Sequence, residues 1–360
     1  MDKQINVGLI GYGVGGQVFH APVLTAIDGL ILKKIRASKP AQVALANKRY
    51  PGAELVTDAG DIINDKTIDL VVITAPNTLH FQMAQQALEA GKHVVVDKPF
   101  TISSAEADEL IELANTKQQV LSVFQSRRFD SDFRTVQKVI KSGLLGNLVE
   151  IESRYDRFRN FLKPYAWREE DIPGSGLLYD LGSHLIDQAL TLFGMPMSVT
   201  AFISKQRAGT KVDDNFELIL HYSGIKVTLK SGMLVREHLQ RFVLLGEEGS
   251  YVKKGIDVQE EALKAGLTPR MASAWGTEPE EIWGIINTSV KGLNFRGKVE
   301  SEKGDYAAYY QNVYEAIVNG SALLVTAEQA RDVIRIIELA FQSDSENRTM
   351  DVTEFLKKIK

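Results

Sequence analysis

The sequence predicts an α/β protein with two domains: a parallel sheet in the first, and an open, mainly antiparallel sheet in an α+β second domain. Over roughly the first 125 residues, short apolar runs alternate with helix-like stretches, which is typical of a parallel sheet covered by helices. After about residue 145 the pattern changes to alternating apolar and polar positions. Because 360 residues exceed the usual size of one core, we expect domains over 1–125 and 126–360.

Four strands of the first domain are predicted from apolar runs: Ile5–Ile10, Asp69–Ala75, His93–Val96 and Val120–Phe124. Asn77 is a suitable N-cap for a helix predicted over 78–90, and Gly91 ends that helix. Ser103–Glu106 forms a capping box that begins another helix.

The second domain begins its sheet with a predicted hairpin. Phe216–Tyr222 and Ile225–Leu229 alternate in polarity on either side of a Ser223–Gly224 turn, so one face of the hairpin is expected to be buried. An open sheet has a second face to cover, and a partner subunit is one way to cover it. We therefore expect a homodimer or a homotetramer.

The end of the chain is helical by pattern, and the stretch before it is not. Thr326–Gln329 is a capping box that begins a helix running to about Gln342. Residues 253–300 combine scattered glycines with Trp275 and Trp283, and are expected to form an irregular excursion over the surface.

Composition excludes several classes of function. A net charge of −4 offers no basic excess for nucleic acid, and no apolar run is long enough to span a membrane. The absence of cysteine excludes disulfides, thiolate nucleophiles and Cys-ligated metals, and histidines with carboxylates at ligand spacing are lacking, so no metal site is expected. Because Met1–Gln4 runs directly into the first strand, we expect no signal peptide and a cytoplasmic protein.

A glycine-rich turn, Gly11–Gly16, follows the first strand. In a dinucleotide-binding Rossmann unit, Gly11 would make the tight turn, Gly13 would let the backbone approach a pyrophosphate, and Gly16 would let the next helix pack closely. The N–H groups at the start of that helix would then face the phosphates. The alternative is a tight strand-to-helix turn that binds no ligand.

The residues after the second strand bear on the cofactor. NAD-binding units place an acidic residue about 20 positions beyond the glycines, where it accepts the ribose 2′-hydroxyl. Here that region holds no carboxylate, and Arg36, Ser38 and Lys39 instead suit a 2′-phosphate. NADP(H) is therefore preferred, with NAD(H) possible. The alternative is a solvated loop from which Arg36 points away.

Four segments resemble one known family. They are Gly11–Gly16 with Phe19–Pro22, Thr74–His80, Gly91–Pro99 and Gly176–His184. Their order and spacing are similar to those of the Gfo/Idh/MocA family, the glucose–fructose oxidoreductase, inositol dehydrogenase and rhizopine-catabolism group of nicotinamide-dependent oxidoreductases. Within it, Gln125–Asp130 and Phe193–Pro196 resemble the branch of NADP-dependent scyllo-inositol dehydrogenases. The family more often has Glu where this chain has Asp97.

Lys98 lies just beyond the carboxyl end of a buried parallel strand, where open α/β sheets place their ligands. Its ammonium could hydrogen-bond the substrate oxygen and stabilise developing alkoxide character. The alternative from sequence is a surface lysine paired with Asp97, and the resemblance implies the functional role.

Asp180 and His184 are spaced i, i+4, so on a helix they share one face. A histidine can take or return the alcohol proton, and Asp180 could orient the imidazole or bind a substrate hydroxyl. A packed helix-face histidine is the alternative, and Asp187 lies on the same face and could share the role. With the other segments present, His184 is favoured as the general acid/base, assisted by Lys98.

Further candidates are assigned by residue type and place. Tyr155, Arg157, Trp167 and Arg168 could bind a polyol or sugar substrate from the second domain. Tyr12, Pro76, Asn77 and His80 are expected to flank the cofactor, and Lys98 is expected to lie beside it as well. His221 and His238 are not expected to be ligands.

Taken with the resemblance, these residues predict an NADP(H)-dependent oxidoreductase. It would transfer hydride between nicotinamide and a secondary alcohol or ketone of a cyclic polyol or sugar. The alternative is a non-catalytic NADP(H)-binding sensor or regulator on the same fold. The pairing of Lys98 with His184 disfavours a sensor, which has no use for a proton relay.

Overall fold

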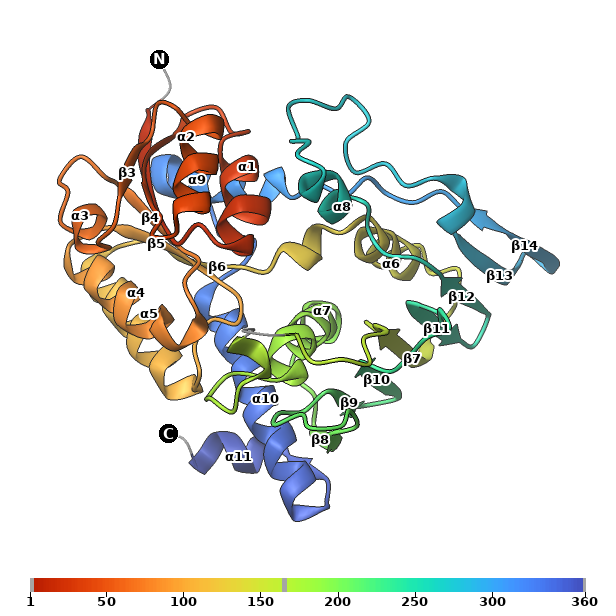
Figure 1. Ribbon diagram of the computed structural model, residues 1–360. Coiled ribbons are helices and arrows are strands. Elements are labelled where there is room, and N and C mark those ends of the chain that lie inside the picture. The colour runs from red at the N-terminus through yellow and green to blue at the C-terminus, as the bar shows by residue number, and fades with distance from the viewer. Residues whose placement is uncertain (1–2, 164–166, 359–360) are drawn as a thin grey trace. The chain divides into compact units, whose positions relative to one another are not determined.

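The computed structural model describes residues 3–163 and 167–358. Its contacts divide the chain into two compact units (Figure 1). Unit 1 comprises 1–129, 258–275 and 305–331, and unit 2 comprises 130–257, 276–304 and 332–360. The predicted division assigns everything after residue 125 to the second domain. In the structure, two later segments, 258–275 and 305–331, belong to unit 1.

Unit 1 contains the predicted parallel sheet. Its six strands lie in the order β3-β2-β1-β4-β5-β6, and every pair is parallel. The strands are β1 (Ile5–Ile10), β2 (Leu30–Arg36), β3 (Glu54–Val56), β4 (Leu70–Ile73), β5 (His93–Asp97) and β6 (Leu121–Phe124). This is the strand order of a doubly wound dinucleotide-binding domain, and it confirms the predicted fold of the N-terminal domain.

The helices of unit 1 are η1 (Gly15–His20), α1 (Ala21–Leu24), α2 (Pro40–Arg49), α3 (Gly60–Ile63), η2 (Asn77–Leu79), α4 (His80–Glu89), α5 (Ser104–Lys117), η3 (Ser126–Phe129), α8 (Gln259–Lys264) and α9 (Ala307–Asn319). Most of them lie between these strands in sequence, whereas η3, α8 and α9 come after the last strand. The capping box of α5 is confirmed, because Ser103 and Glu106 exchange both bonds. The prediction of Asn77 as an N-cap is wrong, since the 3₁₀ turn η2 lies between Asn77 and the start of α4.

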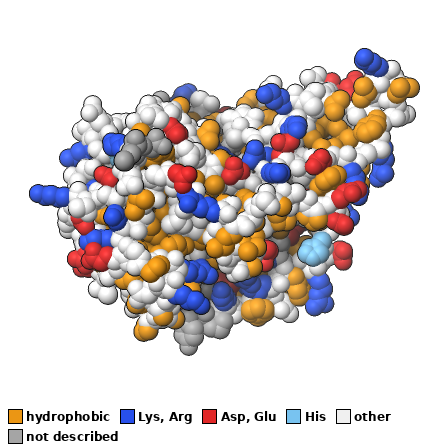
Figure 2. Space-filling model, turned by 90° about the horizontal axis from the view of Figure 1, so that it is seen from above, with side chains coloured by type: hydrophobic (Ala, Val, Ile, Leu, Met, Phe, Trp, Pro, Cys, Tyr) orange, Lys and Arg blue, Asp and Glu red, His pale blue; other side chains and the backbone are white. Residues whose placement is uncertain are grey.

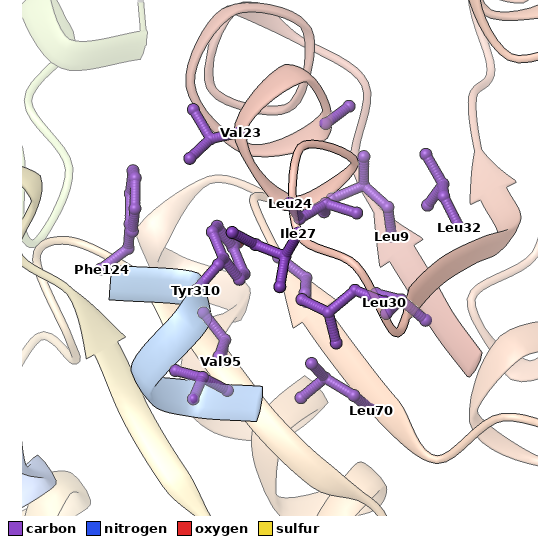
Figure 3. Close-up of a cluster of buried hydrophobic side chains, with 14 of the residues drawn as sticks. Leu9, Val23, Leu24, Ile27, Leu30, Leu32, Leu70, Val95, Phe124 and Tyr310 are labelled. Atoms are coloured by element: carbon purple, nitrogen blue, oxygen red, sulfur yellow. The ribbon is translucent and has the colours of Figure 1, made fainter. Parts of the chain in front are cut away.

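The core of unit 1 includes residues far from the sheet in sequence. Tyr310, on α9, lies among Leu24, Ile27 and Val95 (Figure 3). Tyr310 is fully buried, and the exposed fractions of the nearby Tyr306 and Tyr309 are at most 1%. The second half of the chain therefore contributes aromatic surface to the first core, which explains why packing and sequence order divide the domains differently.

Unit 2 contains a nine-stranded sheet in the order β14-β13-β12-β11-β7-β10-β9-β8-β15, in which only the pair β7–β10 is parallel. The strands are β7 (Leu148–Arg154), β8 (Ser198–Ser204), β9 (Asn215–Tyr222), β10 (Ile225–Gly232), β11 (Phe242–Gly246), β12 (Gly249–Lys253), β13 (Gly284–Val290), β14 (Leu293–Val299) and β15 (Met350–Asp351). The prediction of an α+β domain on a mainly antiparallel sheet is confirmed.

The helices of unit 2 are α6 (Ser131–Lys141), η4 (Trp167–Glu169), η5 (Leu178–Gly182), α7 (Ser183–Phe193), η6 (Glu280–Ile282) and α11 (Val352–Lys358). Helix α10 (Ala327–Glu346) begins in unit 1 and continues into unit 2. Its predicted capping box is confirmed, because Thr326 and Gln329 exchange backbone-to-side-chain bonds of 3.2 and 3.3 Å.

The two faces of the unit 2 sheet differ in composition. On one face, residues such as Leu218, Leu220 and Leu229 are almost fully buried. The other face carries cross-strand ion pairs, including Lys230–Glu217, beside Phe202, whose side chain is 60% exposed. The predicted β9–β10 hairpin is confirmed, with Tyr222 paired to Ile225 across a two-residue turn.

The expectation of an irregular excursion over 253–300 is wrong in part, because β13 and β14 form a regular hairpin there. The turn residues Lys291 and Gly292 both have positive φ, of 52° and 81°, as a two-residue hairpin turn requires. The missed signal was the Lys-Gly pair between two alternating runs. Figure 2 shows hydrophobic side chains at this hairpin, where Leu293 and Phe295 are 75% and 52% exposed.

Candidate active site

In unit 1, three predicted site segments follow three adjacent strands. The glycine-rich turn follows β1, Pro76 and Asn77 come after β4, and Lys98 comes after β5. Because β1, β4 and β5 are parallel neighbours, their carboxyl ends lie at one edge of the sheet. The strand order reverses between β1 and β4, and ligands of open α/β sheets bind at such a position.

The glycines of the turn have separate structural reasons. Gly11 has φ +102°, and Thr74 donates from Oγ1 to its carbonyl oxygen at 2.7 Å. A Cβ on Gly16 would lie 2.3 Å from that same carbonyl, so any side chain there would displace the turn. Around Gly13, by contrast, a Cβ would meet nothing within 4 Å. The turn is tight at Gly11 and Gly16, and is open at the glycine predicted to face a pyrophosphate.

The helix after this turn starts as a π-helical segment, η1, and only then becomes the α-helix α1. Tyr12, predicted to flank the cofactor, has a ring that is 1% exposed and packs edge-to-face on Tyr50. Burial raises the pKa of the Tyr12 hydroxyl. Any cofactor contact of Tyr12 in this conformation would therefore come from its backbone.

His80 connects the segments that follow β4 and β5. Its Nε2 lies 2.9 Å from the carbonyl oxygen of Ala75, and its Nδ1 lies 2.9 Å from that of Pro99. The side chain is 1% exposed, and burial lowers its pKa. His80 thus holds the backbone on both sides of the predicted cofactor residues, and Asn77 beside it is 2% exposed.

Lys98 is half-buried, and Asp97 before it receives several contacts. The backbone N–H of Lys98 donates to Oδ1 of Asp97 at 2.8 Å, and Nε2 of the fully buried His20 lies 3.4 Å from the same oxygen. Nδ1 of His20 is 2.6 Å from the hydroxyl of Tyr310. Burial alone would raise the pKa of Asp97, but its interactions with His20, Lys98 and His80 lower it. Asp97, which stands where the family more often has Glu, is therefore contacted on its buried side by His20.

The residues predicted to select the cofactor lie at the end of β2 and the start of α2. Arg36 donates from Nε to the carbonyl oxygen of Thr57 at 3.1 Å, and is partly buried. Ser38 is exposed, and the exposed Lys39 occupies the N-cap position of α2. The two charged side chains thus differ in their surroundings. The Arg36 guanidinium donates to a backbone carbonyl, whereas Lys39 is an exposed residue at the N-terminus of α2.

In unit 2, the predicted substrate residues gather around Asp180. Its carboxylate lies 3.3 Å from Nε of Arg168 and 3.7 Å from a terminal nitrogen of Arg157. The guanidinium of Arg168 stacks on Trp167 at 4.5 Å from the ring centroid. That of Arg157 lies 5.8 Å from the ring centroid of Tyr155. Five residues from three segments therefore form one cluster of alternating charge and aromatic surface.

Asp180 and His184 lie one turn apart, but not on one α-helix as predicted. Asp180 is in the π-helical segment η5, and His184 is in the first turn of α7, which continues it. The side chain of Asp180 is 19% exposed, and His184 is 6% exposed. Asp187, the alternative on the same helix, is 1% exposed. Of the two acids, Asp180 is the more accessible.

Sequence reasoning missed Asp213 and Arg207. Asp213 contacts the start of η5, and Arg207 forms a buried ion pair with Asp214 at 2.8 Å. Both residues lie in a loop that carries no recognisable motif, and only the adjacent pair of acids at 213 and 214 could have drawn attention to it.

Neither a metal-ligand cluster nor a membrane-spanning helix is found among the described residues. In the ranges 3–163 and 167–358, no three or more His, Cys, Asp or Glu residues gather as metal ligands. Within the same ranges, no helix combines the length and the apolar character needed to cross a membrane.

Two family models match the chain. Residues 5–125 match the NAD-binding Rossmann fold of the Gfo/Idh/MocA oxidoreductase family, and residues 137–352 match the C-terminal alpha/beta domain of the same family. Residues 126–136 lie between the two matches.

Individual relatives are similar over different lengths. The scyllo-inositol 2-dehydrogenase (NADP(+)) IolW of Bacillus subtilis is 40% identical, with 96% of this chain and 95% of that protein covered. The levoglucosan dehydrogenase of Pseudarthrobacter phenanthrenivorans is 30% identical over 56% of this chain and 54% of its own. The solved structure of the Bacillus subtilis protein yvaA has a TM-score of 0.92 at 38% identity, and covers 98% of this chain and 99% of its own.

Proposed function

Because the chain belongs to the Gfo/Idh/MocA oxidoreductase family, we propose that it interconverts a secondary alcohol and a ketone on a cyclic polyol or sugar, with NADP(H) as its cofactor. Family membership makes it an NAD(P)-dependent dehydrogenase that acts on alcohols. One observation carries the catalytic proposal: the open Gly13 turn and Lys98 lie at one edge of the unit 1 sheet, beyond the ends of β1 and β5, the two strands that flank β4.

The residues present fit a dinucleotide. Gly11 and Gly16 leave no room for side chains, whereas the space beside Gly13 is open to a pyrophosphate. Pro76, Asn77 and His80 would flank the cofactor, with the backbone around them held by the His80 ring. Ser38 and Lys39 would take the 2′-phosphate of NADP(H), a preference that matches the cofactor in the name of IolW.

A bound nicotinamide would supply the hydride chemistry, as acceptor for the alcohol carbon or donor to the ketone carbon. In the oxidation, the alcohol proton passes to the imidazole of His184, and Lys98 donates a hydrogen bond to the same oxygen. The reverse order, with Lys98 as the immediate proton donor and acceptor, uses the same residues. Asp180 binds a neighbouring substrate hydroxyl and orients His184.

The substrate class is supported by the cluster around Asp180. Arg157 and Arg168 offer planar donors, Asp180 offers acceptors, and the rings of Tyr155 and Trp167 offer apolar faces. A ring with several adjacent hydroxyls matches that set of groups. Relatives whose names give scyllo-inositol and levoglucosan as substrates support the same class.

The test is reduction of NADP⁺ by the purified protein across a panel of inositols and aldoses, with NAD⁺ in parallel. We expect turnover on at least one cyclic polyol or sugar, and a higher kcat/KM with NADP⁺. Tight NADP(H) binding with no turnover on any member of the panel would favour the sensor alternative.

We also propose that copies of the chain associate through the polar face of the unit 2 sheet. The exposed Phe202 and the ion pairs beside it are the residues this proposal depends on. Light scattering after size exclusion is expected to show a homodimer or homotetramer, and Phe202→Glu to dissociate it; a monomer would refute the proposal. A cytoplasmic location stays a prediction.

A further inference from the structure

The loop 205–214 contacts the start of the segment that carries Asp180 and His184. Oδ2 of Asp213 accepts a hydrogen bond from the N–H of Leu178 at 2.7 Å, and the backbone carbonyl of Asp213 accepts one from Leu177 at 2.9 Å. The first N–H groups of a helix have no partner within the helix. A carboxylate at this end also interacts favourably with the helix dipole. Asp213 therefore satisfies the first two donors of the η5–α7 helix.

Gly176 is shaped to receive this carboxylate. A Cβ on Gly176 would lie 2.0 Å from Oδ1 of Asp213, and its φ of +91° favours glycine as well. The carboxylate thus occupies the volume that any other residue at 176 would need. Both oxygens of Asp213 are placed, one on Leu178 and one against Gly176.

Gly176 in turn connects two parts of the proposed substrate site. Its N–H donates to the carbonyl oxygen of Arg168 at 3.1 Å, and its own carbonyl accepts from the N–H of Asp180 at 3.1 Å. The side chains of Arg168 and Asp180 form the 3.3 Å ion pair described above. Asp213 therefore contacts the residue whose backbone sets the spacing of that pair.

The loop itself is fixed by a separate ion pair. Asp214 is 1% exposed and accepts bonds from the backbone N–H groups of Gln206 and Arg207 at 2.6 and 3.0 Å. The Arg207 side chain pairs with Asp214 and also donates to the carbonyl oxygen of Phe161 at 2.9 Å. Because Asp214 is held on several sides, Asp213 next to it presents its carboxylate from a rigid position.

We propose that Asp213 is a positioning residue for the dehydrogenase reaction, and that its carboxylate fixes the start of the η5–α7 helix so that Asp180 and His184 keep their place relative to Arg168. This inference rests on the proposed function. It assigns Asp213 no contact with substrate, and it makes geometry rather than charge the property that matters.

The experiment compares kcat and KM of the full chain with three Asp213 variants and one control. D213A removes the acceptor, D213N keeps an oxygen of the same reach, and D213E keeps the charge but moves it by one methylene. Asp344→Ala is the control, because Asp344 also accepts a backbone hydrogen bond in unit 2, from Ile203 at 2.8 Å, and belongs to neither the loop 205–214 nor the η5–α7 helix.

D213A and D213E are expected to lower kcat/KM for the polyol about 10- to 100-fold, the usual effect of misplaced reacting groups. D213N is expected to recover most of that loss, and D344A to lose little. KM for NADP⁺ should stay unchanged in all four, which a general loss of structure would not allow. If D213A does not fold, D213E against D213N carries the comparison.

Two outcomes overturn the inference alone while the unmodified protein turns over substrate: D213A and D213E both retaining full kcat/KM, or D213E retaining it while D213N loses it. No turnover by the unmodified protein on any polyol or sugar overturns the proposed function, and this inference with it. The two failures are therefore distinguishable from the unmodified protein's rate.

Discussion

The residues proposed to bind the cofactor in unit 1 and those proposed to bind the substrate in unit 2 are held in place by different means. Around the glycine-rich turn and His80, side chains bond to backbone carbonyls, as Thr74 does to Gly11. Around Asp180, charged side chains hold one another, with two arginines sharing one carboxylate. The first arrangement depends on backbone geometry and tolerates little change, whereas the second depends on charge and can be altered one residue at a time.

The largest expected effect comes from removing the one charged group proposed for catalysis in unit 1. Lys98→Met should lower kcat/KM by about 10²- to 10⁴-fold, the range typical of general acid–base groups. Binding of NADP(H), measured by quenching of protein fluorescence, should remain, because the turn that would hold the pyrophosphate is untouched. Unchanged turnover would refute the proposed role of Lys98.

A second prediction concerns the pH dependence of stability in unit 2. Burial, with the adjacent Asp214 adding to it, raises the pKa of Asp213 from 3.8 to about 6, although backbone hydrogen bonds oppose the shift. Because the pKa of Asp213 is higher in the folded state than in the unfolded state, the protonated side chain stabilises the fold. That contribution is complete below the unfolded-state pKa and is lost as the pH rises through about 6. The effect corresponds to roughly 2–3 kcal/mol of unfolding free energy.

Urea unfolding of the protein and of D213N at several pH values measures this effect. D213N should gain stability relative to the unmodified protein as the pH rises from 4 to 8, because it carries no ionisable group at 213. A constant difference across that interval would show that Asp213 does not titrate as the structure indicates.

Asp180→Asn tests whether the residues around Asp180 in unit 2 are held by charge. Arg157 and Arg168 lose their shared counter-charge, so kcat/KM for the polyol is expected to fall about 10- to 100-fold, in line with loss of a charged hydrogen-bonding partner. KM for NADP⁺ is the internal control and should not move. A parallel rise in the KM for NADP⁺ would mean that the two sets of residues are not separable in this way.

The smallest expected effect is on cofactor choice. Lys39→Asp should lower the ratio of kcat/KM for NADP⁺ over NAD⁺ about tenfold, since one charged contact to the 2′-phosphate is replaced by repulsion while Arg36 remains. Lys39→Gln separates loss of attraction from repulsion and should give an intermediate ratio. A ratio that does not fall in either variant would refute the argument for NADP(H).

The same contrast explains what sequence could predict. The residues at the carboxyl edge of the unit 1 sheet could be proposed from sequence, because each is marked by a local pattern. Gly11, Gly13 and Gly16 follow one strand, and Lys98 follows another. The grouping of Tyr155, Arg157 and Arg168 with Asp180 was predicted as residue types and not as contacts, since they come from separate segments. Asp213 was missed, because a cap from a distant loop leaves no pattern near the helix that it caps.

Two features of the fold were hidden for related reasons. The return of α9 to the first core brings Tyr310 to His20, 290 positions away in sequence, which no local pattern indicates. The i, i+4 spacing of Asp180 and His184 predicts a helix and does not indicate that it starts as the π-helical segment η5, since this spacing is compatible with both helix types.

The unequal exposure of the two arginines around Asp180 has a practical consequence for altering substrate choice. Arg168 is 44% exposed and rests on Trp167, whereas Arg157 is 32% exposed and lies three residues beyond the end of β7. A combinatorial library that varies positions 167 and 168 changes exposed side chains of the Asp180 cluster. It leaves Gly176 and the adjacent Asp213 carboxylate intact. Selection from such a library would explore new polyols at little risk to folding, whereas diversity at 176 would yield mostly unfolded chains.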